Sequence, residues 1–207
     1  MTNIDISNKH LDELPKKRFP KTTRILQCDH NNIKSITNLN TRTPVLEILY
    51  CNNNKLTELT HLPHTLKELH CHNNHLTELK HLPGTLRELH CEDNNLRELT
   101  VPNSIEELYC DNNRLTEIPV LPDSLQLLSM NGNNLDGKHL KCYRKYEITQ
   151  NIDALRRCMK PTVNTNDEMS SSESENEMSG GYKRSKRSTR RRSARRGTRR
   201  GSATRKS

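Results

Sequence analysis

Large aromatic residues and long apolar runs are scarce in this sequence. Its 207 residues include no Trp and one Phe, and only 30% are hydrophobic. No segment approaches the roughly 18 consecutive apolar residues of a membrane-spanning helix, so we expect no membrane partner. The N-terminal stretch MTNIDISNKH also lacks the basic and apolar regions of a secretory signal peptide. These absences predict an intracellular protein.

Catalytic signatures are missing as well. The sequence contains no glycine-rich phosphate-binding loop, no H-E-x-x-H motif and no isolated nucleophile beside a base. We therefore expect neither an enzyme nor a bound cofactor.

The net charge of +9 is divided unevenly along the chain. Residues 1–160 carry a formal charge of +1, residues 161–182 carry −5 and residues 183–207 carry +13. The sequence therefore describes a near-neutral body, an acidic linker and a basic tail.

The body is built from a repeat. Six segments share the frame L-x-x-L-x-C-x-x-N-x-L, at intervals of 23, 20, 20, 19 and 20 residues. The fourth position of the frame is always Leu, at Leu26, Leu49, Leu69, Leu89, Leu108 and Leu128. The sixth position is Cys or Met, at Cys28, Cys51, Cys71, Cys91, Cys110 and Met130. The ninth position is always Asn, at Asn31, Asn54, Asn74, Asn94, Asn113 and Asn133. A weaker unit that contains Ile4, Ile6, Leu11 and Leu14 precedes them.

These segments resemble the leucine-rich repeat family, whose frame has Leu where this chain has Cys. The short unit and the recurring Leu-Pro are similar to the repeats of secreted bacterial effectors. The abundance of Cys and Asn is closer to repeat proteins of giant DNA viruses of amoebae. The resemblance implies a right-handed solenoid with a curved parallel sheet on its concave face and an irregular convex side. It also implies protein binding, and a location in the host cytoplasm, the nucleus or the virion.

The physical chemistry of the repeat favours the same fold. Each L-x-x-L-x-C segment is expected to form a short strand, and the strands of successive coils stack in parallel. Alternation points Leu69 and Cys71 inward and His70 and His72 outward. We expect the repeated Asn to turn inward and satisfy backbone groups where the chain leaves each strand. Twenty residues leave no room for a convex helix, so turns and extended segments are expected there.

Composition divides the chain into four parts. The repeats occupy residues 1–137, and a C-terminal cap follows them. Residues 161–182 are expected to be a disordered acidic linker, and residues 183–207 a disordered basic tail, because neither can bury a core.

The cap, residues 138–160, is predicted to be helical. Its apolar residues Ile148, Ile152, Leu155 and Met159 recur at the spacing of one helical stripe. This stripe is expected to cover the open end of the solenoid, as terminal repeats require.

The seven cysteines are compatible with metal binding or disulfides. Five of them occupy one repeat position, which predicts a ladder of small buried hydrophobic side chains. The odd number and the missing signal peptide imply free thiols in a reducing compartment. Cys142 and Cys158 lie in the short cap and are poor catalytic candidates.

Seven histidines lie between residues 61 and 90. His70 and His72 share a strand face and His90 lies beside His70 on the next strand, which leaves a histidine-only metal site open. The sequence favours the alternative, in which these are solvated surface residues of near-identical repeats. We therefore predict no metal site.

The outward positions of the strands form the best candidate binding surface. Tyr50, His70, His90 and Tyr109 make a central stripe, and acidic residues flank it. Aromatic residues among polar groups are typical of protein interfaces, and an acidic row favours a basic protein over nucleic acid. Protonation of the histidines below about pH 6.5 would make this face less acidic. The predicted protein-binding residues are Tyr50, Glu68, His70, His72, Glu88, His90, Glu92, Glu107, Tyr109 and Asp111.

The tail contains thirteen Lys and Arg in 25 residues and no acidic residue. Such a segment neutralises nucleic-acid phosphates without sequence preference, whether DNA or RNA. A nuclear localisation signal and attachment to anionic membranes or acidic proteins are the alternatives. The predicted nucleic-acid-binding residues are Lys183, Arg184, Lys186, Arg187, Arg190, Arg191, Arg192, Arg195, Arg196, Arg199, Arg200, Arg205 and Lys206.

Two functions follow from the sequence. In the first, a monomeric, non-enzymatic scaffold recruits a protein on its concave face, while the tail binds nucleic acid or directs the chain to the nucleus. In the second, the tail is the active part of a nucleic-acid packaging or virion-associated protein, and the repeats are its carrier.

Overall fold

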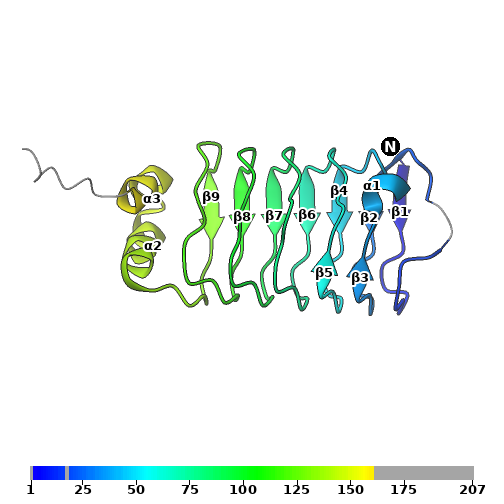
Figure 1. Cartoon of the computed structure of the whole chain (residues 1–207), viewed down its shortest axis with the longest axis horizontal. Coiled ribbons are helices and arrows are strands. Elements are labelled where there is room, and N and C mark those ends of the chain that lie inside the picture. The colour runs from blue at the N-terminus through cyan, green and yellow to red at the C-terminus, as the bar shows by residue number, and fades with distance from the viewer. Residues whose placement is uncertain (1, 17–18, 161–207) are drawn as a thin grey trace, which may run out of the picture. The chain divides into compact units, whose positions relative to one another are not determined.

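A computed structural model describes residues 2–16 and 19–160 of the chain. The predictions for the linker and the tail lie outside these residues. The described part is a solenoid of short parallel strands with two helices after its last coil (Figure 1). Every helix in it is too short or too polar to span a membrane.

Seven strands, one from each coil, form a single parallel sheet in the order of the chain. They are β1 (Thr2–Asp5), β2 (Thr23–Gln27), β4 (Ile48–Tyr50), β6 (Glu68–His70), β7 (Glu88–His90), β8 (Glu107–Tyr109) and β9 (Leu127–Ser129). The register pairs Leu49 with Leu69 and Leu69 with Leu89, so equal frame positions lie side by side. The predicted solenoid of parallel strands is confirmed, and the weaker first unit supplies β1.

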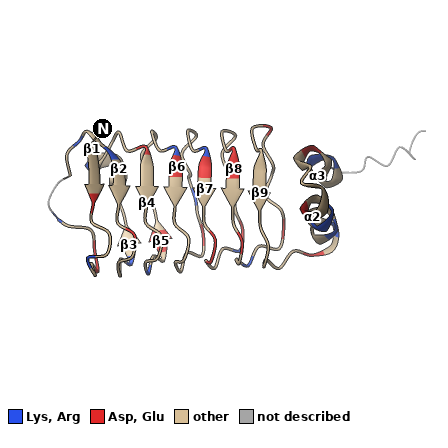
Figure 2. Cartoon of the chain, turned by 180° about the vertical axis from the view of Figure 1, so that it is seen from behind, with Lys and Arg blue, Asp and Glu red and all other residues tan. Residues whose placement is uncertain are grey.

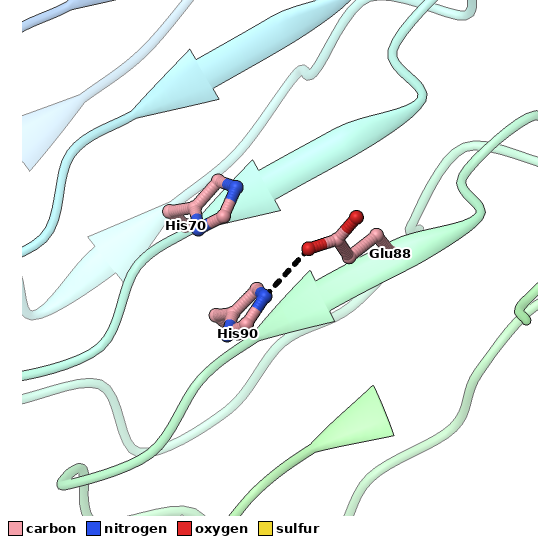
Figure 3. A group of neighbouring side chains, drawn as sticks. All are labelled: His70, Glu88 and His90. Atoms are coloured by element: carbon pink, nitrogen blue, oxygen red, sulfur yellow. Dashed lines mark hydrogen bonds and ion pairs between the residues drawn. The ribbon is translucent and has the colours of Figure 1, made fainter. Parts of the chain in front are cut away.

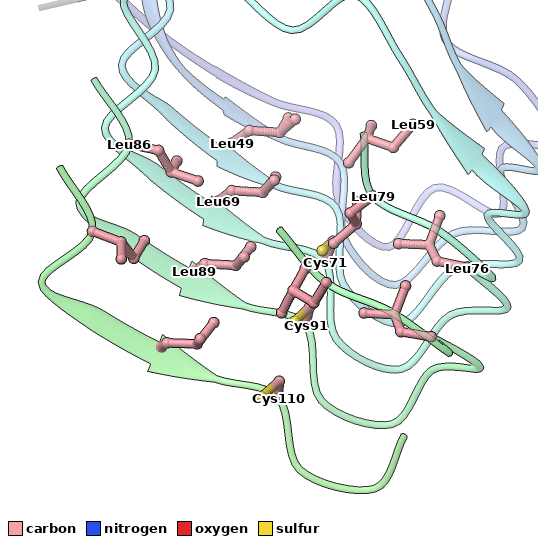
Figure 4. Packing of buried hydrophobic residues seen from close by; sticks show 14 of the residues in the cluster. Leu49, Leu59, Leu69, Cys71, Leu76, Leu79, Leu86, Leu89, Cys91 and Cys110 are labelled. Carbon is pink, nitrogen blue, oxygen red and sulfur yellow. The ribbon is translucent and has the colours of Figure 1, made fainter. Parts of the chain in front are cut away.

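The core consists of rows of identical side chains. Leu49, Leu69 and Leu89 are fully buried, and Figure 4 shows them on successive strands, with Cys71 and Cys91 in a second row. All five repeat cysteines are buried free thiols, as the sequence predicted. Burial raises the pKa of the Cys28 thiol to about 12, which leaves it an uncharged, unreactive group at neutral pH. Since no coil can bury its apolar face alone, these rows hold neighbouring coils together.

The repeated Asn turns inward and connects consecutive coils. The Asn94 Oδ1 accepts the backbone N–H of Leu76 at 2.9 Å. Its Nδ2 donates to the carbonyls of Cys71, Cys91 and Glu92 at 3.0, 3.2 and 3.1 Å. The same pattern recurs at Asn74. The amide is therefore a structural bridge that satisfies buried backbone groups, as predicted.

The convex side differs from the prediction in the longest unit. There the chain forms the one-turn helix α1 (Leu39–Arg42), whereas the sequence predicted no convex helix. The 23-residue interval supplies the three extra residues that this turn needs. Next to it, β3 (Ser35–Ile36) and β5 (Glu58–Leu59) pair as a second, two-stranded parallel sheet.

The C-terminal segment forms two helices, α2 (Gly137–Thr149) and α3 (Ile152–Met159), and not one continuous stripe. Gln150 adopts a left-handed conformation, with φ of 50°, and ends α2. The Asn151 side chain then accepts the N–H of Ala154 and begins α3. The break resets the helical phase, so Ile148 is 85% exposed and does not belong to the buried face. The buried residues are Cys142, Tyr143, Tyr146 and Leu155.

Two tyrosines complete the hydrogen bonding of the last strand. Elsewhere, the N–H of the sixth frame position donates to the next strand, as from Cys110 to the Ser129 carbonyl at 2.8 Å. At β9, the last strand of the described sheet, the Met130 N–H donates to the Tyr143 hydroxyl at 2.9 Å. The Leu128 N–H donates to the Tyr146 hydroxyl at 3.2 Å. These hydroxyls take the place of a further strand and protect the edge from pairing with another chain.

The two cap helices are joined by a disulfide between Cys142 and Cys158, with Cα atoms 5.8 Å apart. The prediction of free thiols is therefore wrong for this pair. Sequence spacing could not reveal it, because the pairing depends on the break between the helices. A disulfide also runs against the expectation of a reducing compartment, so the cellular location stays a prediction.

Candidate binding face

The outward side of the seven-stranded sheet, here called the sheet face, is the predicted concave surface. Across its middle, Tyr50, His70, His90 and Tyr109 form a continuous stack. Their neighbouring ring centroids lie 4.5, 4.4 and 4.3 Å apart. The stack follows from the in-register pairing of parallel strands, because strand spacing and ring-stacking distance are nearly equal. We call these four residues the aromatic stack.

A row of three glutamates, the acidic row, runs beside the aromatic stack. Glu68 lies opposite Glu88 and Glu88 opposite Glu107 in the register, and Figure 2 shows acidic residues on β6, β7 and β8. Like charges placed directly opposite one another are destabilising. Burial raises the pKa of Glu68, and the neighbouring Glu88 raises it further. The three carboxylates therefore repel one another, and a bound cation would reduce this repulsion.

A second row of charges borders the acidic row, and sequence reasoning missed it. These residues occupy the second frame position, which in consecutive coils is Arg24, Glu47, Lys67, Arg87 and Glu106. Glu47 pairs with Arg24 and with Lys67, the latter at 2.9 Å, and Arg87 pairs with Glu106 at 2.9 Å. This row carries one more positive than negative residue. The negative charge of the face therefore lies on the acidic row and on the acidic residues of the seventh frame position, which are Asp29, Glu92 and Asp111.

His90 is the most constrained residue of the face. Its Nε2 lies 2.7 Å from the Glu88 Oε1, and its Nδ1 lies 3.3 Å from the Glu92 Oε1. Burial lowers the pKa of His90, but the hydrogen bonds with Glu92 and Glu88 outweigh this and leave it raised. For Glu92 the two effects have opposite signs: burial raises the pKa of the carboxyl, but the hydrogen bond with His90 outweighs burial and leaves the pKa lowered.

The other two histidines behave in the opposite way. Burial, reinforced by the proximity of His90, lowers the pKa of His70 to about 4, and burial also lowers the pKa of His72. The expectation that all three histidines gain charge together below about pH 6.5 is therefore wrong. Sequence could not show this, because it depends on how deeply each ring packs between its neighbours.

The remaining predicted residues are held by local hydrogen bonds. The Tyr109 hydroxyl donates to Glu107 at 2.9 Å, and burial with this bond raises its pKa to about 12. Asp111 accepts the Ser129 hydroxyl and the Asn131 N–H, both at 2.8 Å. All ten predicted protein-binding residues thus lie on or beside one sheet, while the thirteen predicted tail residues lie outside the described residues.

Comparisons with known proteins concern the fold. No family model matches the chain, and no curated protein matches it. YopM from Yersinia pestis, a leucine-rich effector protein, is 29% identical with a TM-score of 0.57, over 64% of this chain and 43% of that chain. A Shigella effector leucine-rich-repeat domain is 23% identical with a TM-score of 0.56, over 71% of this chain and 76% of that one. YopM from Yersinia enterocolitica is 28% identical with a TM-score of 0.49, over 61% of this chain and 32% of that one. The chain therefore spans less than half of either YopM, and the resemblance to viral repeat proteins stays a prediction.

Proposed function

Since the chain is a leucine-rich-repeat solenoid, we propose that it is a monomeric, non-enzymatic scaffold that binds a basic segment of a protein partner on its sheet face. The observation that carries the proposal is the aromatic stack beside an acidic row. Among the described residues no Lys or Arg forms an ion pair with this row, and His90 is the basic partner of Glu88. The stack offers a continuous row of ring edges across four strands. The row offers carboxylates to Lys or Arg.

The geometry favours an extended segment laid across the strands. Equal frame positions recur at the strand spacing of about 4.8 Å. The strands β4, β6, β7 and β8 each present one ring, and β6, β7 and β8 each also present one carboxylate. A segment crossing these strands would meet the carboxylates of Glu68, Glu88 and Glu107 in succession. The mutual repulsion of the row would fall as each carboxylate acquires a cation, which adds to affinity.

A selection experiment tests this proposal even though the partner is unidentified. A random-peptide display library is panned against the full chain in the presence of a metal chelator, and affinities of enriched peptides are measured. We expect peptides rich in Lys and Arg. The variant Glu68→Gln/Glu88→Gln/Glu107→Gln should bind them about tenfold more weakly, because each exposed ion pair contributes up to about 1 kcal/mol.

The chain provides a matched control. Glu78, Glu98 and Glu117 are exposed and lie outside the seven-stranded sheet, and their triple change to Gln removes the same charge. Affinity within twofold of the unmodified chain is expected for this control. Equal losses in both triple variants would show that net charge alone governs binding and would contradict the proposal.

For the tail we propose non-specific nucleic-acid binding, which also suits a nuclear location or packaging in a virion. The supporting observation is the +13 charge of residues 183–207. Affinity for a DNA duplex and for an RNA strand should fall steeply with salt, as counterion release requires. Deleting residues 183–207 should abolish binding, whereas the triple sheet-face variant should retain it. If the deleted chain binds as tightly as the full chain, the tail is not the binding segment.

The tail-deleted chain and the peptide selection also distinguish the scaffold from the alternative, a packaging protein in which the repeats only carry the tail. The scaffold predicts that the tail-deleted chain still binds the selected basic peptides. The carrier predicts that no specific peptide is enriched at all.

A further inference from the structure

Three residues of the aromatic stack and the acidic row also form a group of metal-ligating side chains. One ring nitrogen of His70, one carboxylate oxygen of Glu88 and one ring nitrogen of His90 lie within 4.8 Å of one another. His70 comes from β6, and Glu88 and His90 come from β7 (Figure 3). We propose that these three residues bind a zinc ion, with the remaining coordination position open to solvent.

The donor set selects the metal. Two imidazoles and one carboxylate with an open position form a ligand set that Zn²⁺ uses in proteins. Mg²⁺ and Ca²⁺ require six or more oxygen ligands, which this group does not supply. Sequence reasoning considered only histidines here. The alternation of the strand adds Glu88, two residues before His90 on the same face.

Two of the three ligands already face one another. The Glu88 Oε1 and the His90 Nε2 lie 2.7 Å apart, and an ion would lie between them in place of the shared proton. Zinc–nitrogen and zinc–oxygen bonds of about 2.0–2.2 Å need this gap to widen by less than about 1 Å. Side-chain rotation of Glu88, which is only partly buried, is sufficient for that change.

A carboxylate behind His90 orients it for metal binding. The Glu92 Oε1 lies 3.3 Å from the His90 Nδ1, on the side of the ring away from Glu88. A hydrogen bond at Nδ1 directs the lone pair of Nε2 toward an ion, an arrangement common in zinc proteins. Glu92 is thus a positioning residue for the proposed site and not a ligand.

Neighbouring tyrosines hold the two imidazole rings. Tyr50 stacks on His70 at 4.5 Å and Tyr109 stacks on His90 at 4.3 Å, so each ring is packed on both faces. The packing limits the motion of both rings, although the two rings, which are 13° from parallel, must tilt toward each other to share an ion. Among the described residues this is the one group of three such side chains with suitable proximity.

The test titrates the metal-free full chain with Zn²⁺ alone, by calorimetry at neutral pH, without any partner protein or peptide. We expect one tight equivalent per chain, with Co²⁺ in its place giving the visible absorption of a low-symmetry site. His90→Gln and Glu88→Gln should each weaken that equivalent at least tenfold, and Glu92→Gln should weaken it less. Excess Mg²⁺ or Ca²⁺ should not compete.

The surface histidines His61 and His81 provide the control, since both are exposed and lie outside this group. The variant His61→Gln/His81→Gln should retain the tight equivalent within twofold. Circular dichroism verifies that every variant is folded. Unchanged zinc affinity in His90→Gln, or an equal loss in the control, would overturn the proposal. Because the peptide selections contain chelator and this titration contains no peptide, either proposal can fail without the other.

Discussion

The asparagine bridges between coils give the most precise prediction about stability. Replacing Asn94 with Ala removes the acceptor of the buried Leu76 N–H, together with the donor to three carbonyls. An unsatisfied buried backbone group costs about 1–3 kcal/mol, and the adjacent coils prevent water from replacing the amide. Since more than one group is left unsatisfied, we expect Asn94→Ala to lower the free energy of unfolding by about 3 kcal/mol.

A second substitution distinguishes the effect of the lost hydrogen bonds on stability from the effect of the smaller side chain. Asn94→Asp preserves the shape and the acceptor for Leu76, but it places carboxylate oxygens against the carbonyls of Cys71, Cys91 and Glu92. We expect it to be at least as destabilising as Asn94→Ala at pH 7. Partial recovery is expected at acidic pH, where the protonated carboxyl can donate one bond.

Urea unfolding of the full chain, followed by circular dichroism, measures these differences. Asn95→Ala is the matched control, because Asn95 is the next residue and is only partly buried. Its free energy of unfolding should remain within about 0.5 kcal/mol of the unmodified chain. An Asn94→Ala variant as stable as Asn95→Ala would refute the bridging role of the repeated asparagine.

Three further predictions concern the cap and the sheet face, and each is measured by urea unfolding. Tyr143→Phe removes the acceptor of the Met130 N–H and should cost about 1–2 kcal/mol, whereas Tyr50→Phe should have little effect. Reducing the Cys142–Cys158 disulfide, which closes a loop of 16 residues, should cost about 3 kcal/mol, and reductant should not affect a chain with both cysteines changed to Ser. The pKa of His70 is lowered to about 4, so the folded chain favours the uncharged ring. The resulting stabilisation is complete above the unfolded pKa of 6.5 and is lost as pH falls toward 4. After allowance for solvent screening this loss is about 1–2 kcal/mol, and His70→Gln should remove that part of the pH dependence.

The sheet face could be predicted from the sequence because the repeat fixes the register. Once strands pair in parallel with equal frame positions side by side, Tyr50, His70, His90 and Tyr109 must adjoin. Neither ring contact nor carboxylate pairing needs further information about the fold. The pKa of each histidine could not be predicted from the sequence, because it depends on the burial of the ring and on the positions of individual carboxylates.

The cap was less predictable because it does not repeat. Ile148 matches a helical stripe, yet the chain breaks at Gln150 and leaves this residue exposed. The hydroxyls of Tyr143 and Tyr146 acquire their role only from the unpaired edge of β9, a tertiary feature. The ion pairs of Glu47 with Arg24 and Lys67 are different, because they join second frame positions of successive coils, which the register of the repeat places side by side.

Photo-crosslinking at defined positions tests most directly whether the sheet face is the binding surface. The photoreactive residue p-benzoylphenylalanine replaces Tyr109 in the aromatic stack, or the exposed Glu98 outside the sheet, in otherwise identical full-length chains. Each chain is irradiated with a basic peptide from the selection at a concentration above its Kd. We predict a strong crosslink from position 109 and little from position 98. A crosslink confined to position 98, or equal yields at both positions, would contradict a partner site on the sheet face.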